Sequence, residues 1–522
     1  MQNAKSGEPH VSRSTALLIW AAIAVMDVTS LSFFASHGLS NLYGDGMAHV
    51  EGARRLFDSL APGYQQIGTV WLPLFHLLAA PLAINITLWR TGLAGSLISA
   101  AAFAVAAWLI FRLGFEMNRN VSAGVLALAG FLLCVSLLYL ASAPMTEVPA
   151  ILWAVLVTFF LFRFQQSGRT APLLWASIAA LLGTLTRYDG WYLLPFATLF
   201  VLLSRRDSWT ERLQHAVVFC SIAAVGPLLW IVHNAYRFHN PFAFYNGPGS
   251  AKAIYVHQLL TTGFAYPTDG SLWISAHYYL EDLRLVLGPW SLILACLGAI
   301  VWVLEQEQRR PRAATLLLLV PLPFYVESLA FSSVALYVPT LFPHSYYNLR
   351  YGLEMVPALA LLPSFLLSNR LAPERRSGLL ALLIAVLAGQ CVGAVWRGAR
   401  KIPVVTEAIV NTPCRAKAQQ DVVRFLRGRY KGGEVFLDSG EWPCVMPQVG
   451  IPYREIVTPR DKSFMAELHS DAVAAVSWII LERGDSVDNV MESFPDAFKD
   501  FAQVDLRHLR DRSYVEILRR SQ

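Results

Sequence analysis

Carboxylate side chains stand just beyond the ends of several long apolar stretches of this sequence. Asp45 follows the first stretch and lies between Gly44 and Gly46, and Glu147 lies in the short connection between two later stretches. The two glycines predict a sharp turn that leaves the Asp45 carboxylate accessible, although an ordinary polar loop explains the same residues. A carboxylate so placed can take a proton from a hydroxyl group. We therefore predict Asp45 as a general base, and Glu147 as a second acid that orients an acceptor or helps to bind a metal.

Cationic side chains occupy similar positions. Arg187 and Arg350 flank apolar stretches, Tyr351 follows Arg350, and Lys252 lies in a long connection rich in aromatic residues. A guanidinium presents a planar fork of donors that matches a phosphate group, and an ammonium supplies a point charge. We therefore predict that these four residues bind the phosphate of a donor substrate.

Two histidines, His49 and His233, could bind a metal ion or the acceptor. A histidine that only satisfies a hydrogen bond is the commoner case for each of them. The sequence therefore names no certain cofactor, and a divalent metal ion is the one that it leaves open.

The composition indicates a protein that crosses a membrane several times. Apolar residues make up 55% of the 522 residues and charged residues only 15%, and the mean hydropathy is +0.44. Many apolar stretches have the length of about 20 residues that spans a bilayer as a helix. The net charge of +6 comes mostly from Lys and Arg at predicted cytoplasmic helix ends, so it does not indicate a nucleic-acid partner.

Three Arg-rich connections, at 205–212, 305–312 and 369–376, are predicted to be cytoplasmic because positive charge accumulates on that side. Counting outward from them gives about eleven spans and places the C-terminus outside. The predicted spans are 14–35, 91–111, 121–141, 147–164, 171–187, 190–204, 214–234, 286–304, 313–334, 351–368 and 377–396. The connection 235–285 falls outside, and its aromatic residues suit either a functional loop or a belt at the lipid headgroups.

The N-terminal part divides into a leader, an anchor and an outer loop. Residues 1–13 are predicted to be cytoplasmic, and 14–35 to be a retained span, because this stretch is long for a signal peptide and contains Asp27. A carboxylate inside a bilayer is costly, so Asp27 should face the bundle and have a partner. Residues 36–90 form the predicted catalytic outer loop.

Two segments of this loop have predicted structure. After Gly46, apolar residues recur at helical spacing, which predicts an amphipathic helix on the membrane surface with Asp45 at its start. Residues 71–86 are apolar but short and contain two prolines, so they predict an interfacial or re-entrant segment rather than a span.

Residues 401–522 have the pattern of a small α/β domain outside the membrane. Helices are predicted at 420–426 and 488–494, and strands at 434–438, 478–482 and 514–518. Cys414 and Cys444 could form a disulfide if this compartment is oxidising. We find no nucleophile elbow, phosphate-binding glycine loop or metal-ligand spacing in this domain, which argues against a catalytic role for it.

Residues 14–400 resemble the GT-C superfamily of membrane glycosyltransferases. The resemblance rests on Asp45 in the first outer loop, the helix after it, the Pro-containing apolar segment and Glu147 in the second outer loop. Within the superfamily, the chain is most similar to protein O-mannosyltransferases and lipid A aminoarabinose transferases. The resemblance implies a polyprenyl-phosphate-linked sugar donor and an active site on the extracytoplasmic face. Many members have a paired acidic motif where this chain has only Asp45, which leaves metal use open.

The sequence therefore predicts an α-helical polytopic membrane protein that is a hexosyl- or pentosyltransferase of the GT-C type. It would act in a bacterial inner or plasma membrane and transfer the sugar to a lipid, glycan or protein acceptor. Two alternatives stay open at this point: a transporter of lipid-linked glycans, and a non-enzymatic assembly protein that binds through its C-terminal domain.

Overall fold

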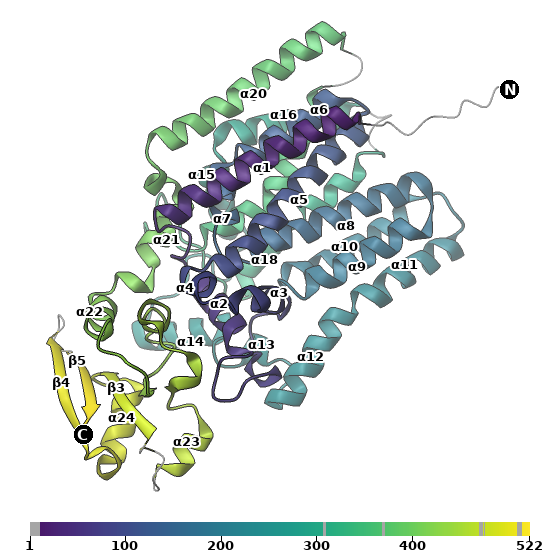
Figure 1. Ribbon diagram of the computed structural model, residues 1–522. Coiled ribbons are helices and arrows are strands. Elements are labelled where there is room, and N and C mark those ends of the chain that lie inside the picture. The colour runs from purple at the N-terminus through teal and green to yellow at the C-terminus, as the bar shows by residue number, and fades with distance from the viewer. Residues whose placement is uncertain are drawn as a thin grey trace. The chain divides into compact units, whose positions relative to one another are not determined.

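The computed structural model describes residues 11–305, 310–367, 371–468, 473, 475–508 and 514–521. The chain forms two compact units, whose elements are labelled in Figure 1. The first contains Met1–Ser40, Thr69–Phe75 and Ser96–Ala408, and the second contains Asn41–Gly68, His76–Gly95 and Ile409–Gln522. Most of the predicted leader, with Arg309 and Arg370 of the cytoplasmic connections, lies outside the described residues.

Within the described residues, seven helical segments are long and apolar enough to cross a membrane, or up to nine if each of two bent pairs is one span. The seven are α1 (Arg13–Ser36), α5 (Leu93–Asn118), α8 (Glu147–Ser167), α11 and α12 (Trp209–Ala223 and Val225–Phe238), η2 and α18 (Ala313–Leu319 and Pro321–Phe331), η3 to η4 (Leu349–Leu366, with α19 at Val356–Leu361), and α20 (Pro373–Trp396). The bent pairs are α6 with α7 (Val121–Leu132, Val135–Ala141; 69°) and α15 with α16 (Leu272–Leu287, Pro289–Leu304; 111°).

Two shorter apolar helices, α9 (Thr170–Thr184) and α10 (Asp189–Ser204), fall where two further spans were predicted. They have 15 and 16 residues, slightly short of a full span. The polytopic helical fold is confirmed, and the count of eleven spans stays a prediction.

The α9–α10 pair is packed closely through glycine. A Cβ atom added at Gly190 would lie 2.7 Å from the backbone of Gly183, which no larger residue could tolerate without moving the helices. The two helices pack with α8 and α11 around a core that includes Val157, Leu173 and Phe219. This close approach fixes the short link Leu185–Tyr188, which carries Arg187.

The connection 235–285 is largely helical. It contains α13 (Ala243–Asn246), α14 (Ala251–Thr262) and most of α15, which was not predicted. The rings of Tyr255 and Tyr266 lie 4.3 Å apart between their centroids. The aromatic residues of this segment are thus partly packed on one another.

Helix α1 differs from the prediction at Asp27. The Asp27 side chain is half-buried, and it has no hydrogen bond or ion pair with another described residue. Only four residues of α1, Ile19, Ile23, Ser30 and Phe34, are buried. The expected pairing is therefore wrong, because few positions of α1 pack against protein.

In the second unit, residues Gly44–Arg55 form α2, and Asp45 lies in its first turn. The predicted sharp turn is wrong, because neither Gly44 nor Gly46 adopts a positive φ and both are helical. The predicted helix is present, but its polar side chains His49 and Arg54 are buried. Arg54 Nε binds Asp58 at 2.8 Å.

The segment predicted to be interfacial forms a short helix. This helix, α3 (Leu74–Ala83), has 10 residues and contains Pro81, and α4 (Ile86–Thr91) follows it. Helix α3 is too short to cross a bilayer, as predicted.

The C-terminal residues form an α/β fold. The sheet order is β2-β1-β3-β5-β4, with β1 parallel to β2 and β3, and β5 antiparallel to β3 and β4. The strands are β1 (Glu434–Phe436), β2 (Ile456–Val457), β3 (Val476–Glu482), β4 (Phe501–His508) and β5 (Tyr514–Arg520), and the helices are α21 (Pro403–Asn411), α22 (Lys417–Leu426), α23 (Lys462–Glu467) and α24 (Ser486–Ser493).

The three predicted strands and both predicted helices of this region are confirmed within a few residues, whereas β2 and β4 were not predicted. Cys414 and Cys444 form a disulfide with their Cα atoms 5.7 Å apart. The possible bridge between these two cysteines is therefore confirmed.

Candidate active site

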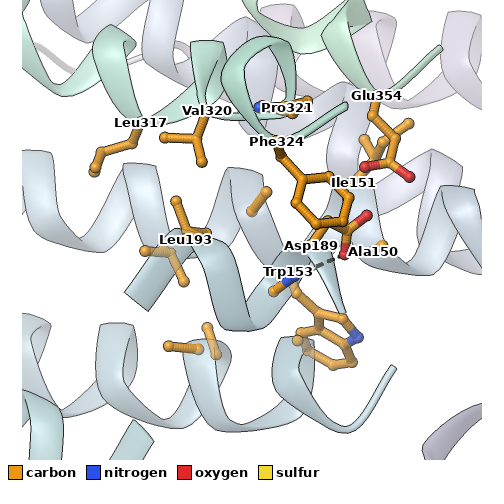
Figure 2. Close-up of a pocket in the computed structure, with 16 residues that line it drawn as sticks. Ala150, Ile151, Trp153, Asp189, Leu193, Leu317, Val320, Pro321, Phe324 and Glu354 are labelled. Carbon is orange, nitrogen blue, oxygen red and sulfur yellow. Dashed lines mark hydrogen bonds between the residues drawn. The ribbon is translucent and has the colours of Figure 1, made fainter. Parts of the chain in front are cut away.

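A pocket opens within the first unit among α8, α9, α10, η2, α18 and η3. The empty space in and in front of it, open solvent included, is about 550 Å³. Figure 2 shows the carboxylates of Asp189 and Glu354 together at one end, and the apolar side chains of Leu193, Leu317 and Val320 at the other. The remaining lining residues are Ala150, Ile151, Trp153, Ala154, Val157, Ala179, Ala180, Gly183, Gly190, Pro321 and Phe324. The pocket is therefore apolar except at its acidic end.

Arg187 connects the two pocket carboxylates to a third. Its Nε lies 3.2 Å from Asp189 Oδ2 and 3.1 Å from Glu354 Oε1. Its Nη1 lies 3.1 Å from Oε1 of Glu147, at the N-terminus of α8. Its Nη2 donates to the Tyr325 hydroxyl at 3.1 Å. One guanidinium thus organises the acidic end of the pocket.

Glu147 is bound by a second arginine from a distant segment. Arg350 Nε donates to Glu147 Oε1 at 2.8 Å, so both guanidinium groups converge on the same oxygen. The Glu147 side chain is fully buried, and its Oε2 atom has no hydrogen-bond partner among the described residues. A buried carboxylate oxygen that lacks a partner is costly.

Helix η3 (Leu349–Met355) carries Arg350, Tyr351 and Glu354 and is held by backbone contacts. Glu407 of α21 accepts hydrogen bonds from the amide of Asn348 at 2.7 Å and from the amide of Leu349 at 2.9 Å. Farther along, Gly352 N donates to Asp282 Oδ2 at 3.0 Å. Carboxylates at the first amides of a helix satisfy donors that have no partner within the helix.

The Tyr351 ring lies between the two arginines. Its centroid is 5.8 Å from the Arg187 guanidinium carbon and 5.4 Å from that of Arg350. It also stacks on Tyr325 with 4.7 Å between centroids. These cation–π contacts spread the positive charge over an aromatic surface and restrict the rotamers of both arginines.

Electrostatics favour the charged form of Arg187, which lies in the link between α9 and α10. Burial alone would lower the pKa of its guanidinium, but the Tyr325 hydroxyl and the three carboxylates around it raise that pKa well above its ordinary value. Among the residues that the structure describes, the carboxylates of Glu147, Asp189, Glu354 and Glu407 pair with Arg187 and Arg350. The network is therefore rich in acceptors for protons and for hydroxyl groups.

Of the residues predicted from the sequence, the structure joins Glu147, Arg187, Arg350 and Tyr351 in this network. Lys252 is exposed on α14, and its ammonium lies 5.1 Å from the centroid of the Tyr245 ring. Asp45 belongs to the second unit, in the first turn of α2. The roles predicted for Lys252 and Asp45 stay predictions.

The two predicted histidines lie in different units. His49 Nδ1 is 3.0 Å from His76 Nε2 in the second unit, and both rings are buried. In the first unit, His233 stacks on Trp230 with 4.5 Å between centroids. No group of three or more His, Cys, Asp or Glu side chains in the described part of the chain has the geometry of a metal site.

Sequence reasoning missed three members of the network: Glu354, Glu407 and Tyr325. Glu354 is an isolated acid in an apolar stretch, the same signal that drew attention to Asp27. Glu407 is an isolated acid among valine, alanine and isoleucine in Pro403–Asn411. Tyr325 gives no comparable signal, because aromatic residues are common in membrane helices.

Comparisons with known proteins show what this chain is similar to in sequence and in fold. The family model of dolichyl-phosphate-mannose-protein mannosyltransferases matches residues 73–231. ArnT from Cupriavidus metallidurans, crystallised with undecaprenyl phosphate, is similar at a TM-score of 0.57 and 13% identity, over 97% of this chain and 98% of that chain. The apo structure of the same protein gives a TM-score of 0.54 at 15% identity, over the same shares of the two chains. A search of curated protein sequences gives no match.

A further similar structure is that of the archaeal oligosaccharyltransferase AglB from Archaeoglobus fulgidus, in complex with an inhibitory peptide and a dolichol-phosphate. Its TM-score is 0.50 at 11% identity, over 98% of this chain and 75% of that chain. At such identities the likeness shows the fold, and it confirms the GT-C-like fold class. The chain is thus similar, in sequence pattern over 73–231 and in fold over nearly its whole length, to membrane glycosyltransferases.

Proposed function

We propose that this protein is an integral membrane glycosyltransferase. It takes a sugar from a polyprenyl-phosphate-linked donor and transfers it to a lipid, glycan or protein acceptor on the extracytoplasmic face. The observation that carries the proposal is the charged network of Glu147, Arg187 and Arg350, which adjoins the acidic end of an otherwise apolar pocket. Such a site suits a substrate with a sugar phosphate at one end and a hydrocarbon chain at the other.

The pocket would hold part of the polyprenyl chain. Its apolar walls, which include Leu193, Leu317 and Val320, can bury isoprenoid methyl and methylene groups. Small residues such as Ala179 and Ala180 leave room between the helices. Two structures of similar fold contain undecaprenyl phosphate or dolichol-phosphate, which supports the same class of ligand here.

The reaction would be a single displacement at the anomeric carbon. The acceptor hydroxyl gives its proton to the Asp45 carboxylate while its oxygen forms a bond to the anomeric carbon. The bond from that carbon to the phosphate oxygen breaks, and the polyprenyl phosphate leaves with the electron pair. The configuration at the anomeric carbon is therefore inverted.

Glu147 and the cations would position the two substrates. Glu147 Oε2 would accept a hydrogen bond from a sugar or acceptor hydroxyl, because Arg187 and Arg350 both bind its Oε1. We propose that these two arginines, together with Lys252, also bind the donor phosphate. Tyr351 would hold the two guanidinium groups in place.

A reconstituted assay tests the proposal. Purified protein in liposomes receives a donor with a radiolabelled sugar on undecaprenyl phosphate, together with lipid and peptide acceptors. We expect the label to move from the donor to one acceptor with release of undecaprenyl phosphate. If the intact donor instead moves between leaflets without loss of its sugar, the protein is a transporter and the proposal is wrong.

A further inference from the structure

Glu407 makes three contacts at the point where η3 begins. Its two carboxylate oxygens accept from the backbone amides of Asn348 at 2.7 Å and Leu349 at 2.9 Å. Its Oε1 also lies 3.6 Å from Arg350 Nη1. Only 1% of the Glu407 side chain is exposed, so water does not compete for these contacts. One carboxylate thus holds both the backbone of this turn and the side chain that follows it.

The turn has a conformation that needs such support. Asn348 adopts the left-handed region with φ of 61°, which is uncommon for a residue other than glycine. Its side-chain Nδ2 donates to the carbonyl of Ala335 at 2.8 Å. Successive backbone amides in this conformation form a concave binding site for an anion, and here the carboxylate of Glu407 fills it.

Arg350 lies between Glu407 and Glu147. Its Nη1 faces Glu407, and its Nε donates to Glu147 Oε1 at 2.8 Å. The guanidinium is planar and rigid, so an anion that fixes one edge also fixes the direction in which the other edge donates. The orientation of Glu147 therefore depends on Glu407 through Arg350.

We propose that Glu407 is a positioning residue for sugar transfer, and this rests on the proposed function. It orients Arg350 so that this arginine binds Glu147 Oε1 and leaves Oε2 for a substrate hydroxyl. Glu407 belongs to α21. This helix follows the last predicted span and lies within the part of the chain predicted as the C-terminal domain.

Asp282 supplies a matched control. It is also a fully buried carboxylate that accepts from a backbone amide of η3, that of Gly352. No ion pair between Asp282 and an arginine occurs in the described part of the chain. The substitutions Glu407→Gln and Asp282→Asn each replace a buried carboxyl group that accepts from the backbone of η3 with an amide, but only the first removes an anion from Arg350.

The experiment measures kcat, KM and the thermal midpoint for wild type, Glu407→Gln, Glu407→Asp and Asp282→Asn in the liposome transfer assay. We expect both amide variants to lose similar amounts of thermal stability. Glu407→Gln should lower kcat about 10- to 100-fold, as a displacement of about 1 Å at a reacting group does. Asp282→Asn should keep kcat within about threefold of wild type, and Glu407→Asp should recover part of the loss because it keeps the charge.

A double-mutant cycle adds a readout that a purely structural role would not change. If Glu407 acts through Arg350, the effects of Glu407→Gln and Arg350→Lys on kcat should be strongly non-additive. Additive effects, or a Glu407→Gln enzyme no slower than Asp282→Asn, would overturn the positioning role. Absence of transfer by the wild type would instead refute the proposed function, so the two failures are distinguishable.

Discussion

Arg350 Nε lies 2.8 Å from Glu147 Oε1, although the two residues are 203 positions apart in the sequence. The contact joins the first turn of α8 to the first turn of η3, and both side chains are buried. A buried carboxylate keeps its charge only when cations and donors replace the lost water. Arg350 and Arg187 both bind Oε1 of Glu147 and so supply this replacement at one of its two oxygens.

The first prediction concerns Glu147. Glu147→Gln removes the charge that Arg187 and Arg350 share, which leaves two cations underpaired in a buried site. We expect a loss of about 3–5 kcal/mol in the free energy of unfolding, typical of a broken buried pair. The transfer rate should fall by about 100-fold or more. Thermal unfolding and the transfer assay measure the two effects separately.

Glu116 is the control for this substitution. It also binds two arginines, with Nε of Arg112 at 2.9 Å and Nη2 of Arg163 at 2.7 Å. It lies at the end of α5, and it does not line the pocket. Glu116→Gln should reduce stability but leave the transfer rate near that of wild type. Equal losses of activity in both variants would show that Glu147 acts only through stability.

The second prediction concerns the pocket. Ala180→Phe fills space between α9 and its neighbours, whereas Ala171→Phe places the same ring on the exposed start of α9. Each methylene group buried in the pocket contributes about 0.8 kcal/mol to binding. If the new ring prevents burial of two methylene groups of the polyprenyl chain, donor binding weakens about tenfold. We expect the donor KM to rise for Ala180→Phe and not for Ala171→Phe. If a folded Ala180→Phe protein has an unchanged donor KM, the polyprenyl chain does not bind in this pocket.

Local patterns predicted the apolar helices and three strands, because each depends on composition or periodicity over a short window. The possible Cys414–Cys444 bridge was instead inferred from the predicted location of both cysteines in an oxidising compartment. The turn expected at Gly44 and Gly46 was wrong because both glycines belong to the first turn of α2, which begins directly after Tyr43. Strand β4 was missed although its apolar and polar residues alternate from Ala502 to Arg507, a pattern that indicates a strand.

The site was predicted only in part, because some of its contacts join segments that are far apart in the sequence. Glu147, Arg187 and Arg350 each follow from their positions at helix ends, where charged residues are noticeable beside apolar stretches. The Glu407 carboxylate accepts hydrogen bonds from the amides of Asn348 and Leu349, which lie 59 and 58 positions away in the sequence. No local pattern contains that information, because it arises only when α21 packs beside η3.

The third prediction concerns orientation in the membrane. Reporter fusions after residues 208 and 372 should indicate the cytoplasm, because both sites lie in Arg-rich connections. Fusions after residues 260 and 430 should indicate the extracytoplasmic side. A cytoplasmic signal from the fusion after residue 430 would place the C-terminal domain, and with it the proposed site, on the other face.

The fourth prediction concerns His76. Burial lowers its pKa to about 4 from an ordinary value of 6.5, so the folded protein holds this ring neutral. Between these two values the unfolded chain binds more protons than the folded one, and stability therefore falls as the pH falls from about 6.5 toward about 4. The thermal midpoint of wild type should decrease over this range. His76→Gln should reduce that slope, and an unchanged slope would mean that other groups cause it.

The most direct test of the central claim compares Asp45→Asn with wild type in the liposome transfer assay. The substitution keeps the size of the side chain and removes its basicity. The account predicts that kcat falls by about 10²- to 10⁴-fold, while the affinity for the polyprenyl-phosphate sugar and the thermal midpoint change little. Arg350→Ala should instead weaken donor binding, because it removes a proposed phosphate ligand. An Asp45→Asn protein that transfers the sugar at the wild-type rate would contradict the account.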